Sequence, residues 1–432
     1  MRVRTMWLAG LVAAGLTLAP AAARAQDGGP IPDQSPSLGG LPRDLFTVRA
    51  QTPDGALPDT EPCPCGVPVP LGHNPNNKWG FYVAAEFVYF RQTNPLEHQV
   101  IANRGFIDAD GSLTGLPGTF IGSGVPVLDA KDAGGPGTFQ PGLRTDIGWR
   151  FKDGTTIDIE WMHLEKAQYF HEATIVPPFF RFGTHALEDS FITAPVFNFT
   201  NTFAGPQNKI STAVFPLASP TATYGIWDGA DIMTISFIQR TESVQAKLRV
   251  PILYNDDCGY RCYGLVGPRF FWVWERFYWR TVNQNADGTA DSTDAAVYSN
   301  IVSNRMYGAF IGLGNEWYIG HGFACSLDVD VAGFVDIVKE RAEYRLDDKF
   351  LPGRIKRART VYSPVPEASA RFDLTWFPWE NIEIKLGYDF MAFANTIASP
   401  QPVTFNVGAL DPAWVHRWRF FDGLTFGMGL MF

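Results

Sequence analysis

The chain closes with the stretch Leu424-Thr425-Phe426-Gly427-Met428-Gly429-Leu430-Met431-Phe432, which decides how the rest of the sequence is interpreted. Every second residue in it is large and apolar, and the residues between are mostly small. A β-strand has this pattern when one face meets hydrocarbon and the other faces a crowded lumen. A soluble sheet can also end on such a strand. The stretch predicts a strand, and the remaining sequence has to decide which solvent it faces.

The other end of the chain has the features of a secretory signal peptide. Arg2 and Arg4 precede an apolar run over residues 7–18, and Ala23-Arg24-Ala25 forms a small-residue cleavage site. We therefore expect residues 1–25 to be removed on export. No later stretch approaches ~18 consecutive apolar residues, so the sequence predicts no transmembrane helix. An exported chain of this kind is periplasmic, secreted or an outer-membrane barrel.

Composition agrees with a barrel. Gly (42 residues) and aromatic residues (14%) are abundant while charged residues amount to 18%, as expected when half of each strand faces lipid and half faces water or a lumen. Loss of Arg2, Arg4 and Arg24 with the signal peptide would take the net charge from −9 to −12. An acidic exported chain is not expected to bind nucleic acid, which requires a basic patch.

Ten segments alternate with the period of two that is typical of half-exposed strands. They cover residues 79–91, 143–151, 155–164, 239–250, 263–276, 305–318, 323–336, 366–377 and 381–393, and a last strand ends at Phe432. Pro268 removes a backbone donor inside one of them, so we expect a bulge or local break there. The sequence predicts an all-β fold, a single antiparallel transmembrane β-barrel of about ten strands.

The connections alternate in length. Short ones lie at residues 152–154, about 251–262, 319–322 and 378–380, and the others run from roughly 27 to roughly 70 residues. In Lys152-Asp153-Gly154, a three-residue loop requires Gly154 in the left-handed region. Short periplasmic turns and long external loops are typical of outer-membrane barrels. We expect a flexible Pro/Gly-rich periplasmic segment over residues 26–77 and the barrel over residues 78–432.

Aromatic residues gather at strand ends, as an interfacial girdle requires. At the expected periplasmic ends they are Trp79, Trp149, Trp317, Trp376, Trp379 and Phe432, and at one outer end they are Phe277, Tyr278 and Trp279.

Charged residues of both signs fall on the face that alternation assigns to the lumen. They are Glu86, Arg144, Asp146, Arg150, Asp158, Glu160, Lys247, Arg249, Arg269, Asp328, Asp330, Arg371, Asp373, Glu383, Lys385 and Asp389. Such groups are tolerated only if they are paired or hydrated. They would either line a selective channel or fill a narrow lumen with ion pairs. Because ten strands enclose little space, we expect a filled lumen, and a narrow or gated conduit remains open.

Cysteine and histidine residues give weak signals. Cys258 and Cys262 could close a small disulfide loop in an oxidising compartment. Cys63, Cys65 and Cys325 make the total odd, so at least one thiol is free or pairs outside the chain. No His is spaced to complete a metal site with the cysteines, so we expect no metal. The seven His form no recognisable catalytic arrangement, so we expect no enzyme activity.

Three stretches resemble the β-barrel porin-like family that is abundant in planctomycete bacteria. They are Gly142-Leu-Arg-Thr-Asp-Ile-Gly-Trp with the following Asp153-Gly154, the pair Gly264-Leu-Val-Gly-Pro-Arg-Phe and Tyr307-Gly308-Ala-Phe-Ile-Gly312, and Leu386-Gly387-Tyr388-Asp389-Phe390 with residues 422–432. The resemblance covers roughly residues 78–432 and implies a porin-like outer-membrane barrel. It supplies no catalytic or ligand residues to carry over to this chain. The terminal Phe432 also resembles that of outer-membrane barrels, which the barrel-assembly machinery reads.

The leading expectation for function is porin-like passive or gated passage of small solutes through the bacterial cell outer membrane. The alternative is a surface-exposed structural or adhesion scaffold that acts through its long loops. A remote alternative is an outer-membrane hydrolase, for which His163 and His171 are the loose candidates. The expected partners are outer-membrane lipid and the barrel-assembly machinery, with no cofactor, and the oligomeric state stays open.

Overall fold

The structure is a computed structural model. It describes residues 80–92, 95–108, 111, 114–134, 139–175, 191–199, 208–209, 223–224, 226–255, 259–284, 290–346, 353–379 and 381–432, which all belong to one compact unit, Glu61–Phe432. The expected signal peptide and N-terminal segment lie outside the described residues, as do Cys63, Cys65, Trp79 and Cys258.

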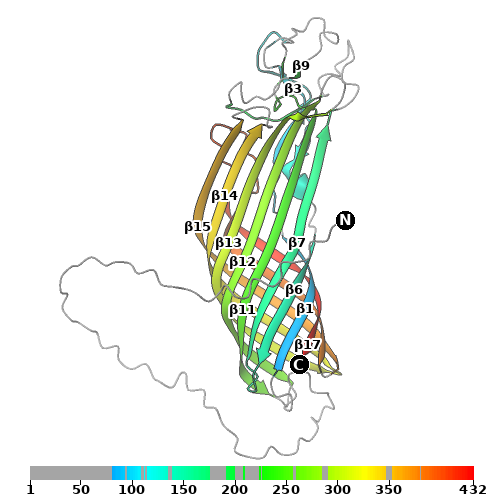
Figure 1. The fold of residues 1–432 in the computed structure, drawn as a ribbon, viewed down its shortest axis with the longest axis vertical. Coiled ribbons are helices and arrows are strands. Elements are labelled where there is room, and N and C mark those ends of the chain that lie inside the picture. The colour runs from blue at the N-terminus through cyan, green and yellow to red at the C-terminus, as the bar shows by residue number, and fades with distance from the viewer. Residues whose placement is uncertain are drawn as a thin grey trace, which may run out of the picture. The chain divides into compact units, whose positions relative to one another are not determined.

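Ten antiparallel strands form a closed ring (Figure 1). In chain order they are β1 (Gly80–Gln92), β6 (Gln140–Arg150), β7 (Thr156–Thr174), β11 (Ile232–Asn255), β12 (Tyr260–Gln284), β13 (Ala290–Gly320), β14 (Phe323–Leu346), β15 (Arg354–Trp379), β16 (Ile382–Ala398) and β17 (Val415–Met431). The last strand pairs with the first in a continuous register from Tyr82–Met431 to Gln92–Phe421, so no strand edge is left open. The predicted ten-stranded antiparallel barrel is confirmed.

Seven shorter strands and one 3₁₀ turn lie in the connections that follow β1 and β7. They are β2 (Val100–Arg104), β3 (Phe106–Asp108), β4 (Thr119–Ile121), β5 (Pro126–Asp129), η2 (Ala130–Gly134), β8 (Ile192–Thr193), β9 (Asn208–Lys209) and β10 (Thr223–Tyr224). β5, β2 and β8 form one small sheet, while β3 pairs with β4 and β9 with β10. Among the described residues no helix is long and apolar enough to cross a membrane.

The two ends of the barrel differ, and we call them the turn end and the loop end. At the turn end, the Phe151 amide donates to the Thr155 carbonyl oxygen at 2.8 Å, and Gly154 has φ = +85°. The three-residue loop predicted from the position of this glycine is therefore present. β1 begins and β17 ends at the turn end. The small sheets belong to connections at the loop end.

Most strands are longer than the sequence pattern predicted, and β11 to β15 exceed their predicted ranges the most. β11 to β15 have 24 to 31 residues, whereas β1 and β6 have 13 and 11. The long loops expected after residues 276 and 336 are mostly strand, because β12 and β13 are separated only by residues 285–289 and β14 and β15 only by 347–353. Beyond the membrane the outward residues become polar, so the apolar alternation on which the prediction relied stops while the hydrogen-bonded ladder continues.

The aromatic girdle expected at the outer end needs a second correction. Phe277 and Trp279 are 2% and 0% exposed and belong to a buried apolar cluster, so they cannot form an interfacial girdle. Their strand extends past the membrane, which places these inward positions under the loops rather than at the lipid boundary.

Large apolar side chains point outward around the ring. Ile311 is 65% exposed, while Val335 and Phe426 are each 58% exposed, and similar residues occupy the outward positions of the other strands. Trp149, Trp317, Trp376 and Trp379 are exposed near the turn end. A water-soluble sheet does not leave an apolar surface of this extent open to solvent. The ring is therefore a transmembrane β-barrel with its lipid-facing band at the apolar outward positions.

Of the two effects expected from Pro268 on the hydrogen bonds between strands, a bulge or a local break, only the break is observed. Pairing between β11 and β12 stops at Gln245–Arg269 and resumes at Leu248–Val266 with the register unchanged. The local break is present because proline has no amide hydrogen. The bulge that was the other expectation is absent, since no residue is inserted on either strand.

Candidate functional site

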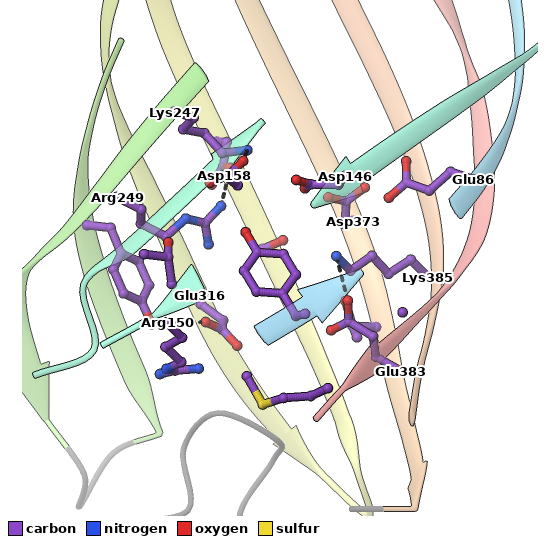
Figure 2. Close-up of a pocket in the computed structure, with 18 of the residues that line it drawn as sticks. Glu86, Asp146, Arg150, Asp158, Lys247, Arg249, Glu316, Asp373, Glu383 and Lys385 are labelled. Atoms are coloured by element: carbon purple, nitrogen blue, oxygen red, sulfur yellow. Dashed lines mark hydrogen bonds and ion pairs between the residues drawn. The ribbon is translucent and has the colours of Figure 1, made fainter. Parts of the chain in front are cut away.

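The sixteen charged residues predicted for the lumen all point inward and line one of two cavities inside the barrel. The larger cavity, of about 170 Å³, reaches the turn end and is lined by Arg150, Lys247, Arg249, Asp373 and Lys385 among others (Figure 2). The smaller, of about 50 Å³, lies among the side chains of the central lumen. The alternating facing of each strand brings these charges together although they come from eight strands.

The larger cavity also has members that the sequence analysis did not name. Tyr82, Tyr263 and Glu316 line it beside the predicted charges. Tyr82 follows from the facing of the first strand, because even-numbered residues there point inward. A polar cavity of this size has room for ordered water. It forms a small polar chamber that reaches the turn end.

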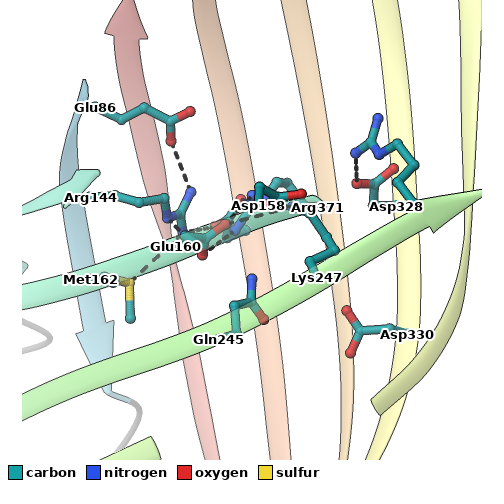
Figure 3. Close-up of polar contacts among 12 residues, drawn as sticks. Glu86, Arg144, Asp158, Glu160, Met162, Gln245, Lys247, Asp328, Asp330 and Arg371 are labelled. Atoms are coloured by element: carbon teal, nitrogen blue, oxygen red, sulfur yellow. Dashed lines mark hydrogen bonds and ion pairs between the residues drawn. The ribbon is translucent and has the colours of Figure 1, made fainter. Parts of the chain in front are cut away.

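Above the larger cavity, toward the loop end, ion pairs cross the lumen. Arg144 contacts Glu86 at 3.0 Å, Glu160 at 3.4 Å and Asp389 (Figure 3). Both terminal nitrogens of Arg371 donate to the carboxylate of Glu160, each at 3.0 Å. Arg371 is on β15 and Glu160 on β7, which are five strands apart in the ring of ten. This bidentate pair therefore spans the full diameter of the barrel.

A second cluster of charges surrounds Arg269. Its guanidinium donates to Asp330 and Glu367, each at 2.8 Å, and its Nε donates to the Gln245 side-chain oxygen at 2.8 Å. The same guanidinium lies over the ring of Phe310, 4.3 Å from the centroid. With every polar face engaged, this arginine fills the lumen and is not available to a passing solute.

A layer of phenylalanine rings follows the ion pairs toward the loop end. Phe271 lies 4.6 Å from Phe393 and 5.5 Å from Phe421, measured between ring centroids, and Phe334 lies 6.2 Å from Phe393. β12, which carries Phe271, is five strands from β17, which carries Phe421, so these rings meet across the diameter. Phe90 and Phe310 belong to the same buried cluster. We call these six residues the phenylalanine layer.

A third contact crosses the lumen beyond the phenylalanine layer. Arg419 on β17 donates to both carboxylate oxygens of Glu275 on β12, at 2.6 Å and 2.7 Å. Gln92 and Gln239 hydrogen-bond to the same carboxylate at 3.3 Å and 3.2 Å. The sequence analysis missed this cluster. Side chains alternate along β17, so counting back in steps of two from the inward Met431 would have predicted that Arg419 points into the lumen.

The connections at the loop end pack against the inward face of the tall strands. Trp227 contacts Trp279 and Tyr344, with ring centroids 5.2 Å and 5.3 Å apart, and all three belong to one large apolar cluster. The Tyr298 hydroxyl donates to the Pro402 carbonyl oxygen at 2.8 Å. Burial raises the pKa of Asp228, next to Trp227, to about 7. We call these connections, together with the inward face that they cover, the loop-end assembly.

The candidate catalytic and disulfide residues do not form a site in the part of the chain that the structure describes. Nδ1 of His163 lies 3.2 Å from Glu242, and Nε2 of His171 lies 3.9 Å from Asp132, so the two histidines have separate partners. Cys262 is a free thiol, and its predicted partner Cys258 lies outside the described residues. No group of three or more His, Cys, Asp or Glu among the described residues could hold a metal ion.

The closed ring, the apolar outward band and the filled lumen together define a transmembrane β-barrel of the bacterial outer-membrane type. No family model and no curated protein matches the chain. Among solved structures it is similar to the outer membrane protease OmpT from Escherichia coli, with a TM-score of 0.37 and 9% identity over 82% of this chain and 97% of that chain. It is also similar to a Pseudomonas aeruginosa FadL homologue, with a TM-score of 0.23 and 8% identity over 82% and 90%. Likenesses this weak carry no argument about activity.

Proposed function

We propose that the protein is an outer-membrane barrel with a sealed lumen that acts at the cell surface as a scaffold, through its loop-end assembly. The observation that carries this proposal is the set of three contacts that cross the full diameter of the ring. They are the Arg371–Glu160 pair, the Phe271–Phe421 contact and the Arg419–Glu275 pair. A solute that moves along the lumen would have to break two bidentate ion pairs and part a packed aromatic layer.

The turn end is then periplasmic and the loop end external, because short turns face the periplasm in barrels of this type. This orientation places the buried cluster of Trp227, Trp279 and Tyr344 outside the membrane. Such a cluster holds the connections in a fixed arrangement, which is what a binding or structural surface requires. The resemblance to the planctomycete porin-like family belongs to the same proposal and agrees with an outer-membrane location.

Gated passage of small solutes is the second candidate function. It is favoured by the hydrated cavity of about 170 Å³ at the turn end, which is lined by charges of both signs. For this function, the phenylalanine layer would have to move when a solute or partner binds.

Single-channel recording in planar bilayers separates the two functions. We expect the wild-type protein to be silent and the variant Phe271→Ala/Phe421→Ala/Arg371→Gln/Arg419→Gln to conduct, because it removes at least one member of each of the three contacts that cross the lumen. Phe270→Ala/Phe420→Ala is the matched control, since these rings lie on the same strands and face outward. Heat-modifiable gel mobility shows that each protein is folded. Reproducible conductance steps from the wild-type protein would overturn the sealed scaffold in favour of passage.

A further inference from the structure

Four basic side chains lie side by side on the outward face of the tall strands. Arg240 is on β11, Arg276 on β12, Arg305 on β13 and Lys339 on β14, which are consecutive in the ring. The residue that precedes each of them is 0% to 6% exposed on the lumen side, so the four basic side chains point outward. We call these four residues the basic belt.

The register of the strands shows that the belt is a local cluster. Arg240 pairs with Trp274, Trp274 pairs with Ser303, and Ser303 pairs with Lys339, so Arg240 and Lys339 lie on one row across four strands. Arg276 lies two residues from this row toward the loop end, and Arg305 lies two residues from it toward the turn end. Because neighbouring strands are about 4.8 Å apart and residues rise about 3.3 Å along a strand, the belt spans about 14 Å around the ring and about 13 Å along the strands.

The belt lies at the edge of the lipid-facing band. On the turn-end side of it, the outward positions of the same strands carry Val244, Tyr307 and Val335, which are 41%, 51% and 58% exposed. On the loop-end side the outward positions carry Arg280, Arg341 and Arg345, together with apolar residues such as Ile301. The belt is therefore at the height where the hydrocarbon ends and the lipid headgroups begin.

The charges of the belt are not neutralised by the described part of the protein. The Arg240 guanidinium lies over the Trp274 ring at 5.3 Å and that of Arg276 over the Tyr278 ring at 5.0 Å, and neither ring is charged. Nε of Arg276 is buried without a hydrogen-bond partner. Among the described residues, no carboxylate pairs with any of the four basic side chains. The nearby acid Glu242 contacts His163 instead, at 3.2 Å.

On the opposite side of the barrel a basic side chain near the same boundary has an acidic partner. There the outward Arg91 is paired with Asp422 at 3.1 Å, and Tyr388 donates to the same carboxylate at 2.6 Å. The basic belt is therefore a property of one face and not of the whole circumference.

We propose that the basic belt binds phosphate-bearing lipid headgroups of the outer leaflet. Guanidinium and ammonium groups are the usual protein partners of phosphate, and basic residues next to the hydrocarbon boundary attract anionic lipids. A span of about 14 Å accommodates more than one phosphate. The inference depends on the proposed outer-membrane location but not on whether the lumen conducts.

The lipids that the protein retains after extraction test whether the basic belt binds headgroups. The full-length protein is reconstituted in vesicles of phosphatidylcholine with a minor share of phosphatidylglycerol, extracted in mild detergent, and its bound lipids are counted by native mass spectrometry. We expect wild-type protein to be enriched in phosphatidylglycerol. In the variant Arg240→Gln/Arg276→Gln/Arg305→Gln/Lys339→Gln, we expect this enrichment to fall roughly tenfold or more, because each cation near the surface contributes to the attraction. Arg91→Gln is the matched control and should retain lipid as wild type does.

Equal retention by the quadruple variant and wild type would overturn the proposal. Loss of bound phosphatidylglycerol on adding millimolar inorganic phosphate would show a site for a soluble anion, and would also overturn the assignment to lipid. If the quadruple variant does not fold, as judged by heat-modifiable mobility, Arg240→Gln/Lys339→Gln replaces it because both side chains are exposed. Conductance by the wild-type protein would refute the sealed scaffold and leave this result unchanged.

Discussion

Individual glycines on the lumen side of β17 are explained by the acids that lie over them. A Cβ added at Gly427 would lie 2.4 Å from Cγ of Glu86, and one added at Gly429 would lie 2.4 Å from a carboxylate oxygen of Glu383. Glu86 is on β1 and Glu383 on β16, the two neighbours of β17. The small residues that alternate at the end of the sequence therefore make room for side chains of the adjacent strands.

Gly267 is the residue at which a methyl group should be least tolerated. A Cβ there would lie 1.8 Å from the Ala246 carbonyl oxygen, which is backbone and cannot turn aside. We expect Gly267→Ala to lower the free energy of unfolding by about 1–3 kcal/mol through overpacking. Gly333→Ala is the control, because no atom lies within 4 Å of its added Cβ, and should change stability by less than about 0.5 kcal/mol. Urea titrations of heat-modifiable mobility compare them, and equal midpoints would contradict the expected clash.

At the scale of residues, the sequence predicts which side chains point inward but not which ones meet. The alternation of side chains along each strand predicted that Arg371 and Glu160 point into the lumen. Their pairing across the diameter depends on ring order and register, which involve residues far apart in the chain. The same reason explains why the phenylalanine layer was missed, because Phe271, Phe393 and Phe421 look like ordinary strand residues until the ring closes.

At the scale of elements, the period of two finds a strand where its outward face is apolar and loses it where that face becomes polar. β14 was predicted to end at residue 336 and continues to Leu346, with Lys339, Arg341 and Arg345 on its outward face. The ladder with β15 nevertheless remains in register as far as Arg345–Arg354. The strand cores were thus predictable from hydropathy, whereas the extensions depend on hydrogen bonds to neighbours that hydropathy does not report.

The closing element gives a prediction about assembly. The amide of Phe432 donates to the Phe81 carbonyl oxygen at 2.9 Å, and its ring lies 6.3 Å from that of Phe81, while 74% of the residue is exposed. We expect Phe432→Asp to reduce the outer-membrane fraction strongly without blocking export. A carboxylate near the interface costs only about 0–1 kcal/mol, so a large loss would reflect recognition by the assembly machinery rather than instability.

Cell fractionation and heat-modifiable mobility measure this effect. Phe432→Trp is the matched control, because it keeps a terminal aromatic ring and should insert as wild type does. Normal insertion of Phe432→Asp would remove the assembly role from this residue and leave the barrel itself unaffected.

At the scale of the whole molecule, the three longest connections, those after β1, β7 and β16, lie at the loop end, so we expect that end to face the outside of the cell. In a variant without native cysteines, a cysteine at Gly353 should react with a membrane-impermeant reagent on intact cells, and one at Asn381 in a short turn should not. Asn381 is preferable to Gly322 for the inner position, since Gly322 has φ = +82° and a side chain there would be strained. Labelling at Asn381 alone would reverse the orientation.

The loop-end assembly has a consequence for anything that approaches the cell from outside. Antibodies and phages usually meet barrel proteins through loops whose sequence can drift freely. Here the connections contribute residues such as Trp227 and Ile192, each 0% exposed, to a shared apolar core with the tall strands. A substitution that altered the shape presented to an antibody or a phage would often disturb that core as well. The described part of this surface should therefore vary slowly and keep its shape when the protein is isolated.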